Sequence, residues 1–404
     1  MVSTARPGPS ALTVLLAVAA SQALVAVANS TLPAIAPKLA EALGVDTSLI
    51  GYQVSLLFGV GTLSTVLGGG FVARFGSCRT MQFSSLACAA GLGLAAVPHI
   101  ACTIVATACI GFALGIINSP AADLIVRYTP PERRNLYFSL KQTGVPLGGM
   151  IAALTAPFIA VRYGWQWSML TGIAWAAVVI AMLQVVGSRW DAAHPSNATA
   201  PKSTGGAAAL VWRIPALRWM ALSGFCYSAI QRCVLTFTVA YLVTEGGYGL
   251  VQAGVLLSMV QAGGICGRPF WGAVADRLRA GNTVLLVIGS ITIAGCILVT
   301  LLSRAWPTPA LAALFFVLGM SSVGWNGVMH AELARLSPPG EVGTVAGGGS
   351  GYIFAGVLAG PALFSMVYAF SGSYTSTFWL TVVCGVAGTG LLVASRRAEH
   401  RPHV

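Results

Sequence analysis

Apolar segments of about 20 residues follow one another along almost the whole chain, and charged residues mark their ends. No charged side chain occurs within residues 7–37 or 47–73, and five further gaps of this kind follow. Each gap fits one apolar helix, because about 20 helical residues cross the ~30 Å hydrocarbon core of a bilayer. Helices are expected because a backbone exposed to lipid must satisfy its own hydrogen bonds.

Two longer uncharged gaps each hold two such helices. Residues 80–122 are interrupted by Pro-His at 98–99, and residues 342–395 are interrupted by SGSYTS at 371–376. The segment 220–244 adds one more span, which carries a single charge. The pattern predicts an all-α integral membrane protein with twelve transmembrane helices.

Composition and charge agree with this interpretation. The chain is 56% hydrophobic and 8% charged, whereas soluble domains have about 25% charged residues. With a cytoplasmic N-terminus, sixteen Lys and Arg residues fall inside and only Lys38, Arg162 and Arg304 fall outside. This asymmetry predicts that both termini are cytoplasmic. The net charge of +12 then follows from topology, and no nucleic-acid partner is expected.

A polar stretch near the middle of the chain, at 188–209, is rich in Ser, Thr, Ala, Pro and Gly and is typical of a flexible linker. It predicts three parts: a six-helix bundle at 1–187, a cytoplasmic linker at 188–215 and a second six-helix bundle at 216–404. The two bundles are expected to be related by pseudo-symmetry.

Sequence repeats support the two-bundle prediction. GGFVARFG at 69–76 follows the second span, and GAVADRLR at 272–279 follows the eighth. RYTPPERR at 127–134 has a weaker counterpart in RLSPPGEV at 335–342. Parallel repeats of this kind occur in transporters whose substrate site lies near the membrane midplane, between the repeats.

With these features, the chain resembles the major facilitator superfamily over essentially its whole length. The family signature after the second span reads roughly G-x-x-x-D-R-x-G-R-R/K. The resemblance implies a conformational gate in which the acid pairs with an arginine and a helix N-terminus. Ala73 replaces the acid in the first copy, so the second copy is expected to supply it. The residues expected to form the gate are Gly69, Arg74, Gly76, Gly272, Asp276 and Arg277.

The fifth predicted span contains KQTGVPLGG at 141–149, which resembles the antiporter-associated G-P-x-x-G-G motif of the family. Val145 separates Gly144 from Pro146 and breaks that motif. We therefore favour close helix packing as the role of these glycines.

In the family, helices 1, 4, 7 and 10 surround a central cavity, and this implies a role for polar positions on those helices. Residues at i, i+4 and i+7 share a helix face. Such faces carry Gln22, Asn29 and Pro33; Ser228, Arg232 and Thr236; Tyr227, Gln231 and Thr238; and Ser322, Asn326 and His330, with Trp325 beside them. We interpret them as the wall of a wet cavity, with hydrogen bonding between helices as the alternative.

Arg232 is the strongest single candidate for a binding residue. An arginine near the centre of a span costs about 2.5–3.5 kcal/mol on insertion scales and is a functional candidate by default. Of the ten acids in the chain, only Asp123 is expected well inside a span, roughly 10 Å from the depth of Arg232. A guanidinium without a protein carboxylate suits a carboxylate, sulfonate or phosphate ligand. The alternative is a structural arginine held by carbonyl groups or water.

Lys141 is a weaker candidate, which is expected to snorkel to the interface, pair with Asp123 or contact substrate. The residues predicted to bind substrate are Arg232, Gln231, Tyr227, Asn29, Gln22, Asn326, Trp325, Lys141 and Gln142. His330 is the candidate for proton coupling, since imidazole titrates near physiological pH.

These patterns and the resemblance predict a secondary transporter that moves a small organic anion, most simply a carboxylate, by alternating access. The alternatives are an exporter of neutral or amphipathic drugs, with Arg232 structural, and a receptor or scaffold that has lost transport. The sequence shows no nucleotide-binding motif and no enzymatic constellation, so we expect no enzyme activity, cofactor or metal. The expected partners are the small-molecule substrate, a coupled proton or counter-anion and the lipid bilayer. We expect a monomer in a bacterial inner membrane.

Overall fold

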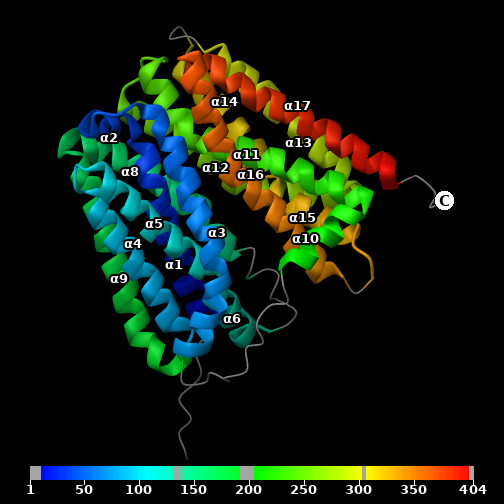
Figure 1. Ribbon diagram of the computed structural model, residues 1–404, viewed down its shortest axis with the longest axis horizontal. Coiled ribbons are helices and arrows are strands. Elements are labelled where there is room, and N and C mark those ends of the chain that lie inside the picture. The colour runs from blue at the N-terminus through cyan, green and yellow to red at the C-terminus, as the bar shows by residue number, and fades with distance from the viewer. Residues whose placement is uncertain are drawn as a thin grey trace, which may run out of the picture. The chain divides into compact units, whose positions relative to one another are not determined.

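The computed structural model describes residues 11–130, 137, 140–191, 204–302, 306–339 and 341–399, and all regular structure in these parts is helical (Figure 1). The prediction of an all-α chain is confirmed. The helices are α1 (Ala11–Ala34), α2 (Ala36–Leu43), the 3-10 helix η1 (Thr47–Leu49), α3 (Ile50–Phe75), α4 (Ser77–Ala95), α5 (Ile100–Ile116), α6 (Asn118–Tyr128), α8 (Gly144–Arg162), α9 (Trp165–Asp191), α10 (Thr204–Arg213), α11 (Pro215–Thr244), α12 (Leu250–Leu278), α13 (Gly281–Thr300), α14 (Thr308–Ser322), α15 (Asn326–Arg335), α16 (Val342–Ser371) and α17 (Tyr374–Glu399).

The described residues contain ten helical segments that are long and apolar enough to cross a membrane, or eleven if a bent pair counts as one span. The bent pair joins α2 to residues 47–65 at an angle of 114°. α4 is not among them, because its first turns carry polar residues that include Arg79 and Gln82. The protein is therefore a multi-pass membrane protein, and the count of twelve stays a prediction.

Both sequence-predicted breaks inside the long uncharged gaps are confirmed. α4 ends at Ala95 and α5 begins at Ile100, where the Nδ1 atom of His99 accepts a hydrogen bond of 3.2 Å from the amide of Ala101. α16 ends at Ser371 and α17 begins at Tyr374. Local polarity and a proline therefore suffice to end these spans.

The prediction of a flexible linker at 188–209 is wrong at both ends, because α9 continues to Asp191 and α10 begins at Thr204. This helix packs against α16: the hydroxyl of Tyr352 donates to the carbonyl of Ala208 at 3.3 Å, and the Trp212 ring stacks on the Tyr352 ring with centroids 6.3 Å apart. Small residues and one aromatic ring thus dock a segment that looks like a linker by composition. Residues 192–203 lie outside the described parts.

The chain forms two compact units. Unit 1 comprises Met1–Asn29, Gly59–Gly149 and Gln166–Ala200, and unit 2 comprises Ser30–Phe58, Met150–Trp165 and Pro201–Val404. Each unit thus gathers segments that are far apart in the sequence. The sequence-predicted boundary at 188–215 remains a prediction.

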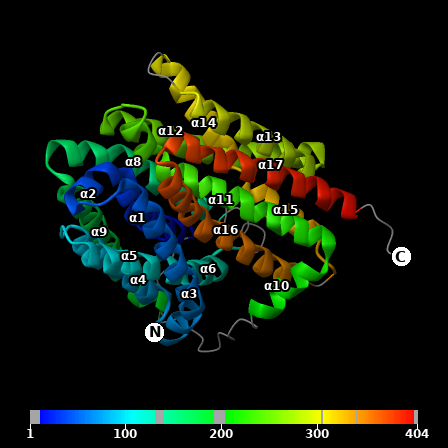
Figure 2. The same cartoon turned by 45° about the horizontal axis from the view of Figure 1, so that its top comes forward.

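In unit 2, α11 packs against both α16 and α17 (Figures 1 and 2). The stacked rings of Phe237 on α11 and Phe364 on α16, with centroids 4.0 Å apart, are both fully buried in this core. Segment 30–58 joins the same unit, because the hydroxyl of Ser55 donates to the carbonyl of Leu358 at 2.7 Å. The start of α3 is therefore fixed to α16.

In unit 1, glycines allow close helix contacts. A Cβ atom added to Gly144 on α8 would lie 2.9 Å from the carbonyl oxygen of Ala19 on α1. A Cβ atom added to Gly148 would overlap the carbonyl oxygen of Ala23. The packing role favoured for the glycines of KQTGVPLGG is therefore confirmed. This contact brings the start of α8 to the level of Gln22 on α1.

Candidate functional site

Arg232 lies near the middle of the 30-residue helix α11 and is half-buried. Its guanidinium carbon lies 4.1 Å from the centroid of the Phe58 ring, which belongs to the same unit and is itself buried. Among the described residues, Arg232 forms no ion pair and no hydrogen bond. The guanidinium is therefore in cation–π contact with the Phe58 ring.

Gln231 joins two other sequence-predicted site residues. Its Oε1 atom accepts hydrogen bonds from Nε1 of Trp325 at 3.0 Å and from Nδ2 of Asn326 at 3.2 Å. The indole N–H can only donate, so the side-chain amide of Gln231 is oriented with its Oε1 atom toward Trp325. The Nε2 group of Gln231 then points the other way, and within the described parts of the chain it has no partner.

Two further predicted residues lie close to this cluster. The Tyr227 ring meets the Trp325 ring edge-on, with centroids 5.8 Å apart, while its hydroxyl donates to the carbonyl of Leu285 on α13 at 3.0 Å. Tyr227 is thus anchored to a neighbouring helix through its polar atom. His330 is exposed, and its Nδ1 atom lies 2.8 Å from the carbonyl oxygen of Asn326.

A break between α14 and α15 presents Trp325 and Asn326. The indole of Trp271 on α12 donates to the carbonyl of Met320 at 2.8 Å. In a continuous helix that carbonyl would accept the amide of residue 324. The side chain of another helix therefore replaces a helical hydrogen bond, and α14 ends at Ser322.

Unit 1 holds a second polar cluster, built around a residue that sequence reasoning missed. The Oδ1 atom of Asn118 accepts hydrogen bonds from Nε2 of Gln22 at 3.1 Å and from Nζ of Lys141 at 3.4 Å. Gln22 and Lys141 are buried, while Asn118 is exposed. Pro120 could have revealed this position, because proline cannot donate to the carbonyl of Ile116, and α5 ends there.

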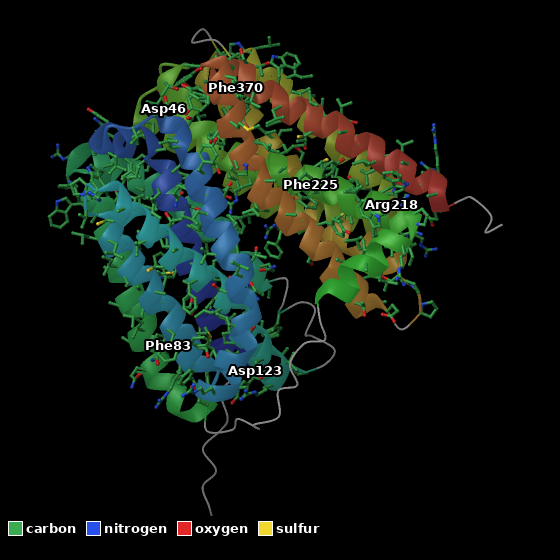
Figure 3. All side chains as sticks on the ribbon, viewed as in Figure 1. Asp46, Phe83, Asp123, Arg218, Phe225 and Phe370 are labelled. Carbon is green, nitrogen blue, oxygen red and sulfur yellow. The ribbon has the colours of Figure 1, made fainter. Side chains whose placement is uncertain are left out.

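Two further predicted site residues also lie in unit 1. Asn29 is buried on α1, and Gln142 is exposed just before α8. Asp123, considered as a partner for Lys141, forms an ion pair with Arg127 and accepts a hydrogen bond from Ser77. Figure 3 labels Asp123, on α6.

The expected gate of unit 1 contains an acid that the sequence signature does not include. Gly69 lies within α3, and Arg74 is exposed with its guanidinium 5.2 Å from the Phe75 ring. Gly76 has a φ of 87°, and a Cβ there would lie 2.5 Å from the carboxyl carbon of Asp191. That carboxylate accepts the amides at the start of α4, from residue 78 at 2.9 Å and residue 79 at 3.1 Å.

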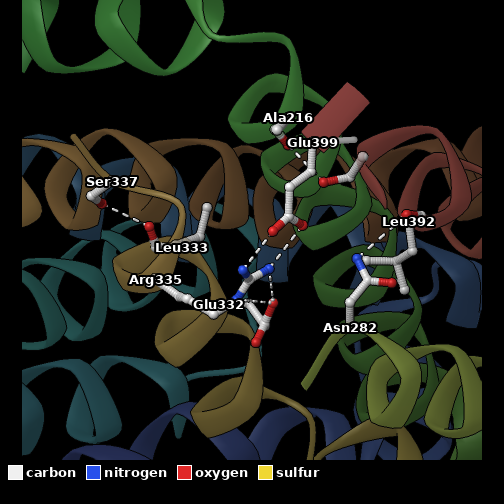
Figure 4. Close-up of polar contacts among 9 residues, drawn as sticks. Ala216, Asn282, Glu332, Leu333, Arg335, Ser337, Leu392 and Glu399 are labelled. Carbon is white, nitrogen blue, oxygen red and sulfur yellow. Dashed lines mark hydrogen bonds and ion pairs between the residues drawn. The ribbon is translucent and has the colours of Figure 1, made fainter. Parts of the chain in front are cut away.

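In unit 2, the signature residues Asp276 and Arg277 are exposed at the end of α12, and neither forms an ion pair with a described residue. Gly272 has no atom within 4 Å of an added Cβ. The gate role of all six signature residues remains a prediction. A charge network lies elsewhere in this unit: Arg335 on α15 pairs with Glu332 at 2.9 Å and with Glu399 on α17 at 2.6 Å (Figure 4).

Long apolar helices that carry partly buried polar clusters define a multi-pass membrane protein. The family model of the Major Facilitator Superfamily matches residues 18–361. The chain therefore belongs to this superfamily of transporters.

Three curated relatives show the range of similarity. An MFS-type transporter of Mycobacterium tuberculosis is 28% identical over 169 residues, which are 42% of this chain and only 37% of that protein. A benzoate transport protein of Acinetobacter baylyi is 23% identical, over 71% of this chain and 67% of its own length. A hexuronate transporter of Bacillus subtilis is 22% identical, over 83% of both chains.

Solved structures agree on the fold. A crystal structure of a peptide transporter, POT, in complex with sulfate matches with a TM-score of 0.75 and 14% sequence identity, over 95% of this chain and 94% of that one. At this identity the match shows the fold alone.

Proposed function

We propose that the protein transports small organic anions, most simply carboxylates, by alternating access, with Arg232 as the anion anchor. The observation that carries this proposal is a guanidinium near the middle of a membrane helix that forms no ion pair within the described residues. Such a charge is costly in a membrane, and an arginine at this depth is therefore a functional candidate. An anionic substrate supplies the counter-charge.

The geometry around Arg232 favours a carboxylate. The guanidinium lies against the Phe58 ring, and its paired N–H groups match the two oxygens of a carboxylate. The Nε2 group of Gln231 adds an uncharged donor one residue away. These donors and the positive charge, with no acidic partner for Arg232 among the described residues, suit an anion and disfavour a cation.

The relatives support the same substrate class. The benzoate transport protein and the hexuronate transporter are both named for carboxylates. One substrate is aromatic and the other is a sugar acid, so the shared feature is the carboxylate group. This is the group that Arg232 would bind.

In this proposal the transporter is a monomer in a bacterial inner membrane, with twelve spans and both termini in the cytoplasm. The Lys and Arg distribution supports the orientation. Substrate would move with a coupled proton or in exchange for a counter-anion. His330 is the proposed proton-coupling residue, because it is exposed beside Asn326 of the polar cluster.

The test is a thermal-shift measurement on the purified full chain with benzoate, galacturonate, an organic cation and a neutral drug. A ligand of the native state raises the melting temperature, and at about 100 times Kd it stabilises the protein by about 2.7 kcal/mol. We expect the two carboxylates to stabilise the wild type clearly more than Arg232→Gln. Arg232→Lys should keep part of the shift, because the charge remains while the planar fork is lost.

The competing function is export of neutral or amphipathic compounds, with Arg232 in a structural role. If the neutral drug or the cation alone stabilises the protein, and does so equally in wild type and Arg232→Gln, the anion proposal is wrong and the exporter takes its place.

A further inference from the structure

The polar clusters of the two units occupy repeat-related positions. Gln231 follows Gln22 by 209 residues, and Asn326 follows Asn118 by 208 residues. Both asparagines are the first residue of the second helix in a broken span, α6 in unit 1 and α15 in unit 2. In each unit the glutamine and the asparagine share one hydrogen bond, of 3.1 Å in unit 1 and 3.2 Å in unit 2.

A donor-only side chain fixes the amide orientation in each cluster. The ammonium of Lys141 can only donate, so it holds the Oδ1 atom of Asn118 toward itself at 3.4 Å. The Nδ2 group of Asn118 therefore points away from the helix contact. Asn118 is exposed, and none of the described residues accepts from its Nδ2 group. Trp325 fixes Gln231 in unit 2 in the same way.

The unit 1 cluster therefore combines an amide N–H₂ group from which no described residue accepts, that of Asn118, with a cation, the buried side chain of Lys141. In unit 2 the corresponding amide group belongs to Gln231, and Arg232 follows it in the sequence. Amide donors beside a positive charge bind an anion through charge-assisted hydrogen bonds.

We infer that Asn118 and Lys141 form an anion site in unit 1, the repeat-related counterpart of the Gln231–Arg232 site, and that it takes a carboxylate group. Asn118 Nδ2 supplies the neutral donors, Lys141 supplies the charge, and Gln22 holds the asparagine in place. The inference rests on the proposed function, because it adds a second carboxylate-binding site to an anion transporter.

The competing explanation is that Asn118 has a purely structural role and links α1, by hydrogen bonds, to the segment that leads into α8. Asn118→Asp separates the two. An aspartate keeps an oxygen that accepts hydrogen bonds from Gln22 and Lys141, so the structural link is preserved. It replaces the outward N–H₂ group by a carboxylate oxygen that repels an anion, and its negative charge offsets the positive charge of Lys141.

The experiment is calorimetric titration of the purified full chain with benzoate and with galacturonate, for wild type, Asn118→Asp and Arg232→Gln. Lys141→Met and Lys141→Arg form a second pair. Gln231→Glu is the matched variant in unit 2, because it makes the same exchange of donor for carboxylate there. Melting temperatures without ligand report on the fold.

We expect the wild type to bind two carboxylates per chain, whereas Asn118→Asp should keep the Arg232 site and bind at the unit 1 site about ten-fold or more weakly, with the melting temperature of the wild type. Lys141→Met should lose affinity to a similar degree, and Lys141→Arg should keep most of it. Gln231→Glu should weaken binding at the Arg232 site in the same way.

Two results overturn the inference in different ways. If Asn118→Asp binds both carboxylates as the wild type does while Arg232→Gln does not, unit 1 has no anion site and the proposed function stands. If the wild type binds neither carboxylate, or Arg232→Gln binds as the wild type does, the proposed function fails and this inference fails with it. Should Asn118→Asp unfold, equal affinities of Lys141→Met and Lys141→Arg would overturn it.

Discussion

At the scale of single residues, the environment of Arg232 decides what the cation can do. The Phe58 ring lies against one face of the guanidinium, and cation–π contacts of this kind contribute about 0.5–2 kcal/mol depending on desolvation. The ring also restricts the rotamers of a long side chain. The guanidinium is then already held in place before a planar anion binds, so less side-chain entropy is lost on binding.

Phe58→Leu should therefore weaken carboxylate binding by about two- to thirty-fold, because the aromatic ring is lost while the charge remains. Phe58→Tyr should bind as the wild type does. The measurement is the titration with benzoate. Phe364→Leu is the matched control, a fully buried phenylalanine of the same unit, and it should lower the melting temperature without changing affinity. Equal affinities of Phe58→Leu and wild type would show that the ring plays no part in binding.

At the scale of helices, glycine positions set how closely the spans approach. α12 and α14 meet at Gly263 and Gly319, where an added Cβ would overlap the carbonyl oxygens of Phe316 and Val260 respectively. Small residues that let backbones approach are the usual means of helix association in membranes. The same contact positions Trp271 to take the carbonyl of Met320 and so ends α14.

Gly263→Ala should lower stability by about 1–3 kcal/mol, because the new methyl group forces two backbones apart. Gly351→Ala is the control on α16, where no atom lies within 4 Å of an added Cβ. Alanine favours a helix over glycine by about 1 kcal/mol, so this variant should melt at or above the wild-type temperature. The comparison uses thermal unfolding in detergent. Equal melting temperatures for the two variants would refute the packing argument.

At the scale of the whole molecule, the repeat extends to charge networks. Arg335 follows Arg127 by 208 residues, and Glu399 follows Asp191 by the same number. Arg335 ties α15 to α17 through Glu399, and Arg127 donates to the carbonyl of Trp190 at the end of α9 at 3.4 Å. In each unit an arginine thus links the second helix of a broken span, α6 or α15, to the end of the last span, α9 or α17.

The topology of the whole chain is tested by alkaline phosphatase fusions, which are active only outside the cytoplasm. Fusions after Pro98 and Ser373 should be active, and fusions after Gly76 and Val404 should be inactive, if the chain has twelve spans and cytoplasmic termini. The fusion after Pro98 is decisive for α4, the least apolar of the long helices expected to cross. An inactive enzyme at that position would show that α4 does not cross.

The sequence by itself determined the membrane class, most spans and their breaks at 98–99 and 371–376, because these depend on hydrophobic length and local polarity. It also singled out Arg232, since the charge pattern alone marks an arginine in an apolar segment. Pro120 also accounts for the break between α5 and α6, because a proline removes one local backbone hydrogen bond.

Only the tertiary structure decided the rest, because the deciding partners are distant in the chain. The α14–α15 break has no proline between residues 319 and 329 and depends on an indole from α12. The Phe58 ring against Arg232 and the Asn118–Lys141 contact join residues from different helices. Helical periodicity reports which residues share a face of one helix, and it carries no information about which side chain of another helix meets that face.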